Sequence, residues 1–242
     1  MIVVRYDIAA VLSRFDVRAK AETELTGKLS ALIGESLLLT TLTQYLADVE
    51  GHVVEVLSGR PHRDDIEFPA DRDGVPRDLD AWLLLDAGQL TAVECKHWTS
   101  SSMNFRTVPE DGEARAAYAT EVWDWLVREH FMEQVWTGVN KVALPLKPPS
   151  RMPSADSYEV RRILAVWTPV SSDGRSCLSR VSTTTIRQEE LAGIEVEVFS
   201  ASLYLRELLA TGVTHLESED EGVEKLLAEL SILVRAGFSA AT

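Results

Sequence analysis

Residues 77–98 read RDLDAWLLLDAGQLTAVECKHW, and this stretch decides how the chain is expected to fold. Two apolar runs, at 81–85 and 90–93, flank a short segment that contains Gly88. Apolar runs joined by a glycine-containing turn of this length predict a β-hairpin. Charged residues stand at the outer end of each run, where the two strands of the hairpin would lie side by side.

Side-chain alternation brings three of these charged residues together. Successive side chains of a strand point to opposite faces, so Glu94 and Lys96 share one face of the second strand while Cys95 points the other way. With a turn at 86–89, the start of the first strand lies beside the end of the second, which brings Asp80 near both. The two carboxylates would repel each other, but a divalent cation between them lets both ionise.

The segments Leu79-Asp80-Ala81 and Val93-Glu94-Cys95-Lys96 resemble the core motif of the PD-(D/E)XK superfamily of restriction-endonuclease-like nucleases. In that family an acid in one strand is followed by Glu-x-Lys in the next strand. No proline precedes Asp80, although that position of the motif is often variable. Asp78 lies on the same face two residues earlier and is a rival for the first acid. We prefer Asp80 because it is closer to the apolar body of the strand.

The resemblance implies a magnesium-dependent phosphodiester hydrolase, either an endonuclease or an exonuclease. Asp80 and Glu94 would bind Mg²⁺ or Mn²⁺, with the Cys95 carbonyl as a further ligand, and Lys96 would position or deprotonate the attacking water. The helix before the hairpin often contributes a glutamate in this family, and Glu35 is the matching position. Glu35 would complete the acidic shell directly or through water.

The pattern around the motif predicts the elements of such a core. Leucines at spacings of three, four and seven predict a helix over 22–49, ended by Gly51. We expect strands at 52–57 and in the hairpin, then a helix over 109–136 and a strand at 161–167. This order indicates an α/β fold with a restriction-endonuclease-like αβββαβ core over about 22–167. A mixed central sheet would be flanked by helices, and 1–242 would form a single nuclease-like domain.

Further elements are expected at both ends of the chain. The pattern predicts a strand at 1–6, a helix at 8–15, a strand at 194–199 and a helix over 203–211. Ser200 or Ser202 can cap that last helix. Segment 177–185 is ambiguous in its secondary structure. The acidic run 217–221 is interpreted as the solvated start of a final helix over 223–234.

Composition limits the class of protein. At 242 residues and 45% hydrophobic content, the chain can build a substantial core. It has neither an apolar run long enough to cross a membrane nor a charged-then-apolar leader, so we expect a cytoplasmic protein without a membrane span. The two cysteines, Cys95 and Cys177, and five scattered histidines predict neither a disulfide framework nor a zinc site.

The net charge of −14 opposes nucleic-acid binding by bulk electrostatics. Nucleic acid, with DNA preferred, is nevertheless the partner that the resemblance implies. The acidic balance favours weak binding alone, or help from a protein partner or a homo-oligomer. A basic rim could serve the site, although interleaved acids favour a solvated loop. Its candidate residues are Arg60, His62, Arg63, Arg72 and Arg77.

The segment after the hairpin offers an aromatic ring. Trp98 lies on the Glu94 face by alternation, where it would either meet a substrate strand or pack against the core. His97 points away from the acids and is interpreted as structural.

Two other hypotheses remain open. A domain of the same fold that has lost catalysis would act as a binding or scaffold subunit, which the acidic surface favours and the presence of all four candidate site residues opposes. Alternatively, Asp80, Glu94 and Lys96 form a surface ion-pair cluster in an unrelated α/β protein. A nuclease would be consistent with restriction, repair or defence against foreign DNA, and the residues select none of these roles.

Overall fold

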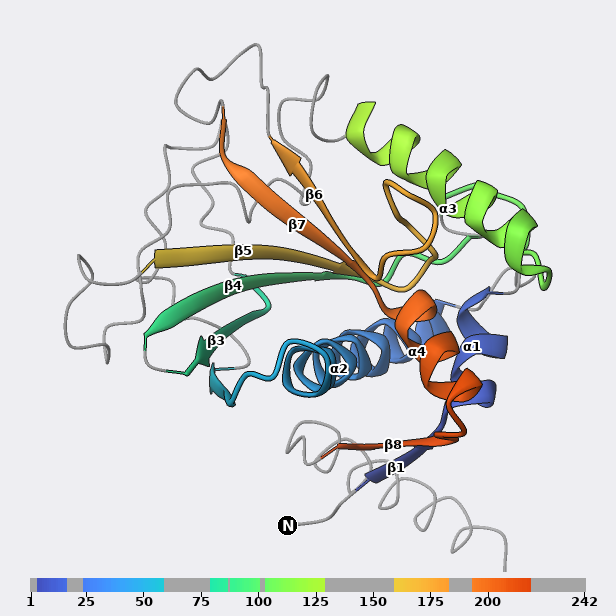
Figure 1. Cartoon of the computed structure of the whole chain (residues 1–242). Coiled ribbons are helices and arrows are strands. Elements are labelled where there is room, and N and C mark those ends of the chain that lie inside the picture. Colours follow the sequence, from blue (N-terminus) through green and yellow to red (C-terminus); the bar gives the residue numbers. More distant parts are fainter. Residues whose placement is uncertain are drawn as a thin grey trace, which may run out of the picture.

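The computed structural model of the chain describes residues 4–16, 24–58, 79–86, 88–100, 103–128, 159–182 and 193–218. These residues form a mixed six-stranded sheet with helices on both faces (Figure 1), together with a separate two-stranded sheet. In chain order the elements are β1 (Val4–Asp7), α1 (Ile8–Asp16), α2 (Glu24–Asp48), β2 (Val54–Ser58), β3 (Ala81–Leu85), β4 (Gln89–Lys96), α3 (Gly112–Leu126), β5 (Glu159–Val166), β6 (Leu178–Ser182), β7 (Glu195–Ser200), α4 (Ala201–Ala210) and β8 (His215–Ser218).

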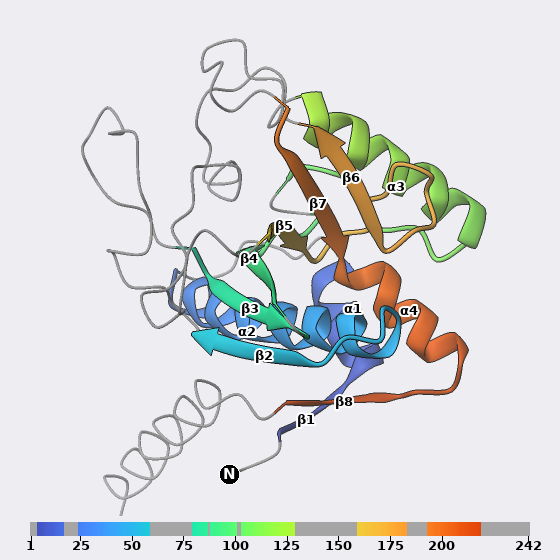
Figure 2. The ribbon, with the colours of Figure 1, turned by 60° about the vertical axis from the view of Figure 1, so that its left-hand side comes forward.

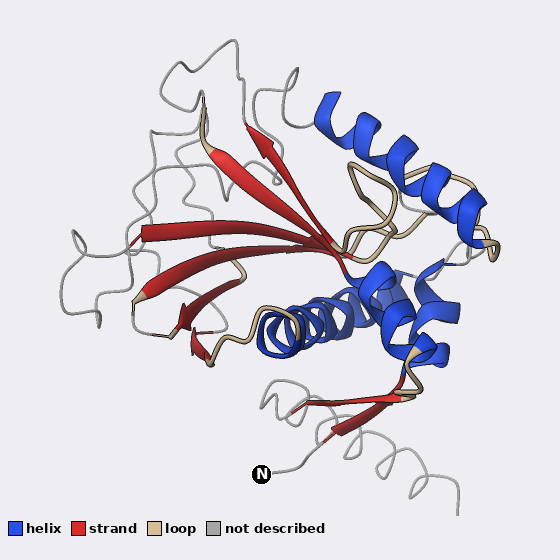
Figure 3. Cartoon of the chain, in the orientation of Figure 1, coloured by secondary structure: helices blue, strands red, loops and turns tan. Residues whose placement is uncertain are grey.

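The large sheet joins an antiparallel half to a parallel centre. Its strand order is β2-β3-β4-β5-β7-β6. Strands β2, β3 and β4 pair antiparallel, β5 pairs parallel with β4, and β7 pairs parallel with β5 (Figure 3). Strand β6 closes the far edge antiparallel to β7. The prediction of an antiparallel hairpin inside a mixed, helix-flanked sheet is therefore confirmed.

The central hairpin forms as its sequence predicts. In the β3–β4 ladder, Ala81 pairs with Val93 and Leu85 pairs with Gln89. The turn uses positive φ angles of 38° at Asp86 and 129° at Gly88. Glycine adopts such an angle without steric cost, which is why it marks the turn.

Alternation along the strands divides the core into two layers, one on each face of the sheet. Side chains such as Leu83 and Ile163 pack with α1, α2 and α4. Side chains such as Trp82 and Leu164 pack with α3, which lies over the opposite face (Figure 1). Glu94 has the same parity as Ala92, so it belongs to the α3 face, while Cys95 belongs to the α2 face.

Helix α2 approaches the sheet closely where β4 ends. A Cβ built on Gly34 would lie 2.1 Å from Cδ2 and 3.3 Å from Cγ of His97, so glycine permits this contact. The His97 ring meets Phe15 edge-on, with ring centroids 5.0 Å apart, and Phe15 stacks on Trp167 at 4.2 Å. His97 thus packs between α1 and α2, as its expected structural role requires.

The end of the described chain departs from the prediction. Glu217 was expected at the start of a helix, and this expectation is wrong. Residues His215–Ser218 instead form β8, which pairs antiparallel with β1 and lies apart from the large sheet (Figure 2). The partner strand begins at Val4, and a local pattern cannot reveal pairing over that separation in sequence.

Other boundaries shift by a few residues. The ambiguous segment contains β6 (Leu178–Ser182), and α4 begins at Ala201 rather than 203. Ser200 is its N-cap, with Oγ accepting a hydrogen bond from Leu203 N. Several predicted features lie outside the described residues: Asp78, Arg60, His62, Arg63, Arg72, Arg77 and the helix at 223–234. No helix in the described ranges is long and apolar enough to cross a membrane.

Replacing Gly34 with alanine should destabilise the fold. The new methyl group would force the His97 ring out of its contact with Phe15, and overpacking of this kind costs about 1–3 kcal/mol. Alanine recovers only about 0.5–1 kcal/mol through helix propensity. Urea denaturation should therefore give a lower free energy of unfolding for Gly34→Ala. Gly112→Ala is the matched control, since its Cβ meets nothing closer than 3.9 Å. If Gly34→Ala and Gly112→Ala both had the free energy of unfolding of wild type, the close contact between Gly34 and His97 would be contradicted.

Candidate active site

Asp80 closes the β3–β4 ladder with its side chain. Its main-chain N–H donates to the Val93 carbonyl at 3.2 Å, and its Oδ2 accepts from Cys95 N at 2.7 Å. The ladder ends with the pair Ala81–Val93, so Asp80 lies one residue beyond β3, beside the end of β4 that carries Glu94. The carboxylate thus takes the place of a main-chain acceptor at the end of the strand.

Glu94 is a fully buried acid held by one lysine. Its side chain has no exposed surface, and its Oε1 forms an ion pair with Nζ of Lys96, whose side chain is 23% exposed. Both residues lie on the α3 face, two positions apart on β4. Burying a carboxylate is costly unless a cation and hydrogen bonds compensate for lost hydration, so this ion pair makes the position of Glu94 tolerable.

Glu35 approaches the same region from the opposite face of the sheet. It lies on α2, beside Gly34, whereas Glu94 belongs to the face that α3 covers. Burial, followed by the charges of Asp80, Glu94 and Glu35, raises the pKa of the Cys95 thiol well above its ordinary value. The charges of all three acids therefore act on the Cys95 thiol. Among the described residues, however, no three Asp, Glu, His or Cys side chains form a group that could hold one metal ion.

The donors at this end of the hairpin suit a hard cation. Asp80 and Glu94 supply carboxylate oxygens from adjacent strands. In an antiparallel ladder the N–H and C=O of one residue point to the same side, so the Cys95 carbonyl faces the Asp80 side. Mg²⁺ is commonly held by one or two carboxylates with waters and substrate oxygens completing its shell. Two acids and a carbonyl fit that requirement.

A buried hydroxyl cluster lies just beyond this site. The Tyr118 hydroxyl donates to Ser100 Oγ at 2.9 Å and lies 3.4 Å from Thr168 Oγ1. Thr168 N also donates to the carbonyl of Trp98, which ties the segment after β4 to the end of β5. Sequence reasoning missed this cluster because its members come from three distant segments with no shared spacing.

A second charged assembly occupies the other end of the large sheet, beside a cavity of about 620 Å³. Nη1 and Nη2 of Arg161 bind both oxygens of Glu50, at 2.6 and 2.9 Å. Arg161 also pairs with Glu197, which accepts a further bond from Arg180 at 2.9 Å. His52 lies 3.4 Å from Glu50. These groups largely satisfy one another, so the assembly fastens strands together.

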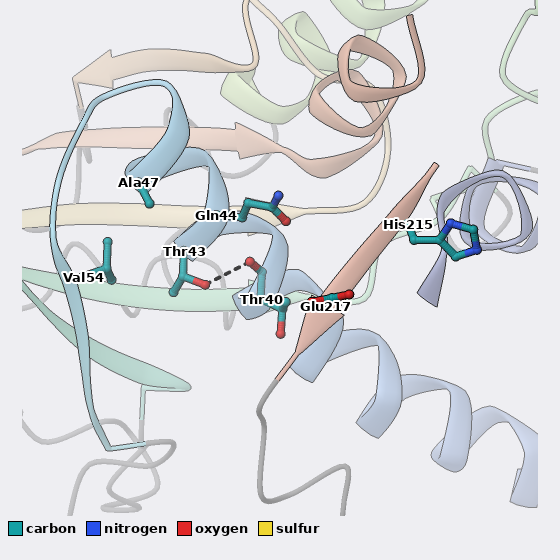
Figure 4. A pocket seen from close by; sticks show the side chains of 7 residues that line it. All are labelled: Thr40, Thr43, Gln44, Ala47, Val54, His215 and Glu217. Carbon is teal, nitrogen blue, oxygen red and sulfur yellow. Dashed lines mark hydrogen bonds between the residues drawn. The ribbon is translucent and has the colours of Figure 1, made fainter. Parts of the chain in front are cut away.

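A third hollow, of about 440 Å³, lies between α2, β2 and β8 (Figure 4). Its lining is mostly neutral and polar: Thr40, Thr43, Gln44, Ala47, Val54, His215 and Glu217. Glu217 is the one acid in this lining. This lining offers no converging set of acids, so the hairpin end remains the better candidate for catalysis.

Comparisons of the chain with protein-family models, with curated proteins and with solved structures returned no match. The function of the site must therefore be argued from its own geometry and chemistry.

Removing the Lys96 ammonium should destabilise the fold through Glu94. We expect Lys96→Met to lower the free energy of unfolding by about 3 kcal/mol, because it removes the cation that offsets a fully buried carboxylate. Adding Glu94→Gln should restore much of the loss. Urea denaturation of both single variants and the double variant gives the coupling energy. Additive effects would show that the ion pair contributes nothing to stability.

Glu50 should make stability depend on pH. Burial raises its pKa, but the hydrogen bonds and charge of Arg161 outweigh burial and hold the pKa below 4.5. Glu50 therefore stabilises the fold above that pH, and this contribution is lost as pH falls through the lowered value. Glu50→Gln should cost about 1.5–3 kcal/mol at neutral pH and flatten the acid limb of the stability curve.

Asp86 and Asp173 also make stability fall at acid pH, because hydrogen bonds from His52 and Ser176 respectively lower their pKa values. Both acids are present in wild type and in Glu50→Gln, so the difference between the two stability curves reports on the Glu50 carboxylate alone. Glu217→Gln serves as the control, since its pairing with Arg5 is 3.9 Å long and exposed. An acid limb unchanged by Glu50→Gln would refute the assignment.

Proposed function

We propose that this chain is a metal-dependent nuclease that hydrolyses phosphodiester bonds, with DNA as its preferred substrate. The observation that carries the proposal is the buried Glu94, ion-paired to Lys96, at the end of the hairpin where the Asp80 carboxylate accepts from Cys95 N. Buried charges are costly, and their convergence at one end of a sheet is typical of functional sites. The element order α2-β2-β3-β4-α3-β5 further supports a restriction-endonuclease-like core.

Each site residue would have a separate role in binding the metal ion or positioning water. Asp80 and Glu94 would hold Mg²⁺ or Mn²⁺, with the Cys95 carbonyl as a third donor and Glu35 acting through water. The bound cation would supply Lewis-acid polarisation of the scissile phosphate and favour ionisation of water. Lys96, as an ion-paired ammonium, donates hydrogen bonds, so it would orient the attacking water and stabilise charge on the phosphate oxygens.

The reaction is a hydrolysis at phosphorus. A water oxygen forms a new bond to phosphorus, the bond to one bridging oxygen breaks, and a proton passes to the departing alcohol. Burial of Glu94 keeps bulk water from its carboxylate, which strengthens the electrostatic interactions of the site.

Cleavage assays with Mg²⁺ or Mn²⁺ on single-stranded DNA, duplex DNA and RNA test this proposal. Asp80→Asn and Glu94→Gln should each reduce the rate at least about 100-fold, because each removes charge from the reacting centre. Asp86→Asn is the matched control: it changes an acid at the opposite end of the same hairpin, bound to His52 and Val53. No metal-dependent cleavage by the wild type, or equal rates in Asp80→Asn and wild type, would refute the proposal.

Lys96 variants require a stability check in that assay. From the sequence alone, Lys96→Ala is expected to abolish cleavage while leaving the fold largely intact. Because Glu94 is fully buried against Lys96, such a change also threatens the fold. Rates should therefore be compared only at temperatures where each variant is folded by circular dichroism.

One alternative has specific support. The net charge of −14 and the saturation of a Glu94 oxygen by Lys96 favour a catalytically silent subunit that binds or scaffolds a partner. Titration with Mn²⁺ by calorimetry separates the two functions. A nuclease should bind the ion in an Asp80-dependent manner, and a scaffold should not.

A further inference from the structure

Strand β2 forms one edge of the large sheet (Figure 2). Val53 directs its main chain toward β3: its carbonyl accepts a hydrogen bond from Asp86 N at 3.1 Å, and its N–H donates to Asp86 Oδ1 at 2.9 Å. The main-chain groups of an antiparallel strand alternate in direction, so those of Val54 and Val56 point away from β3. In the described sheets no strand pairs with this outer side of β2. The edge therefore offers hydrogen-bond donors and acceptors to an added strand.

Apolar side chains are exposed along this edge. In the described part of the chain, the large apolar side chains that are exposed are Val49, Val53, Val56 and Val213. Val53 and Val56 lie at the edge itself, with 76% and 48% of their surface exposed, and Val49 lies four residues earlier, at 57%. Valine favours strand pairing, and exposed apolar residues at an unpaired edge are prone to bind another strand. The outer side of β2 thus has the properties of an interaction surface.

The surface that surrounds this edge is acidic. Segment 44–58 contains Asp48, Glu50 and Glu55 but neither lysine nor arginine. Glu50 is neutralised by Arg161, with both carboxylate oxygens bound. Glu55 lies between the two outward-facing residues of β2, is exposed, and has no ion pair within the described ranges. One unneutralised carboxylate therefore stands at the centre of the edge.

Charge decides which kind of strand fits. A second copy that used the outward groups of Val54 and Val56 on both chains would pair antiparallel around Glu55. The two Glu55 carboxylates would then face each other, which destabilises a strand pair. Each copy also carries a net charge of −14. A strand with lysine or arginine beside Glu55 replaces this repulsion with attraction, so the edge favours a basic strand over another copy.

We infer that the outer edge of β2 binds an extended basic segment of a partner protein by strand addition. The main chain of that segment would bond to the N–H and C=O groups of Val54 and Val56. Its lysine or arginine side chains would meet Glu55, and its alternate apolar side chains would cover Val56. The inference is independent of the proposed nuclease function, because it uses no residue of the candidate active site.

A labelled peptide, Thr-Lys-Val-Lys-Val-Lys-Thr, is the probe for this surface. Fluorescence anisotropy should show that wild type binds it at least about tenfold more tightly than Thr-Glu-Val-Glu-Val-Glu-Thr. Glu55→Lys should reverse this preference, and because Glu55 is exposed, circular dichroism should show an intact fold. Glu110→Lys is the matched control, since it makes the same charge change at an exposed acid outside the sheet. It should keep the wild-type preference.

Backbone methylation separates strand addition from simple charge attraction. An added strand pairs through alternate main-chain amides, so N-methylating either the lysine or the valine residues of the probe gives a matched pair. One modification should abolish binding and the other should leave it intact. Binding of both methylated peptides would overturn strand addition. Failure of wild type to bind the unmodified probe, or equal affinity for the lysine and glutamate peptides, would also overturn the inference.

Sedimentation velocity tests a second copy as the competing occupant. Wild type is expected not to dimerise through β2. Val54→Pro removes one outward N–H and leaves the hydrogen bonds of Val53 to Asp86 in place, because proline is tolerated where an edge strand faces solvent. A wild-type dimer that Val54→Pro dissociates would assign the edge to a second copy and overturn the inference.

Discussion

The register between β3 and β4 is the constraint on which the candidate site depends. Pairing of Ala81 with Val93 brings Asp80 beside the end of β4, where its carboxylate accepts a hydrogen bond from the Cys95 N–H. A slip of one residue would turn every side chain of β3 to the other face. Leu83 and Leu85 have no exposed surface, so the apolar core prevents that slip. Hydrophobic packing therefore fixes the geometry of a polar site.

Charged groups are concentrated at both ends of the large sheet, and the balance between acidic and basic side chains differs between the two ends. At the end of β4, one ammonium faces a fully buried carboxylate, with Asp80 on the adjacent strand. At the other end, Arg161 binds both Glu50 and Glu197, so donors and acceptors are closely matched. An excess of acid over base is what attracts a cation. This difference distinguishes a candidate catalytic site from a structural charge network.

Local sequence patterns predicted the elements near the motif and failed where pairing is remote. The hairpin and α2 follow from turn chemistry and leucine spacing, which are local signals. Strand β8 was not predicted, and its last two residues were taken as the start of an acidic run leading into a helix, because its strand partner lies at the other end of the sequence. Glu35 was expected to complete the acidic shell directly or through water, and the helix that carries it, α2, covers the face of the sheet opposite to that of Glu94. Spacing along a helix cannot say which face of a distant sheet that helix will cover.

The sequence by itself determined the hairpin, the face shared by Glu94 and Lys96, and the nearness of Asp80, because alternation and a short turn are properties of adjacent residues. Only the tertiary structure decided that Glu94 is completely buried, that α3 brings Trp125 against Trp98, and that Arg161 joins Glu50 to Glu197. Burial and contacts between remote segments arise when helices and strands pack into layers. No local pattern encodes that packing, since each contact depends on where another part of the chain comes to lie.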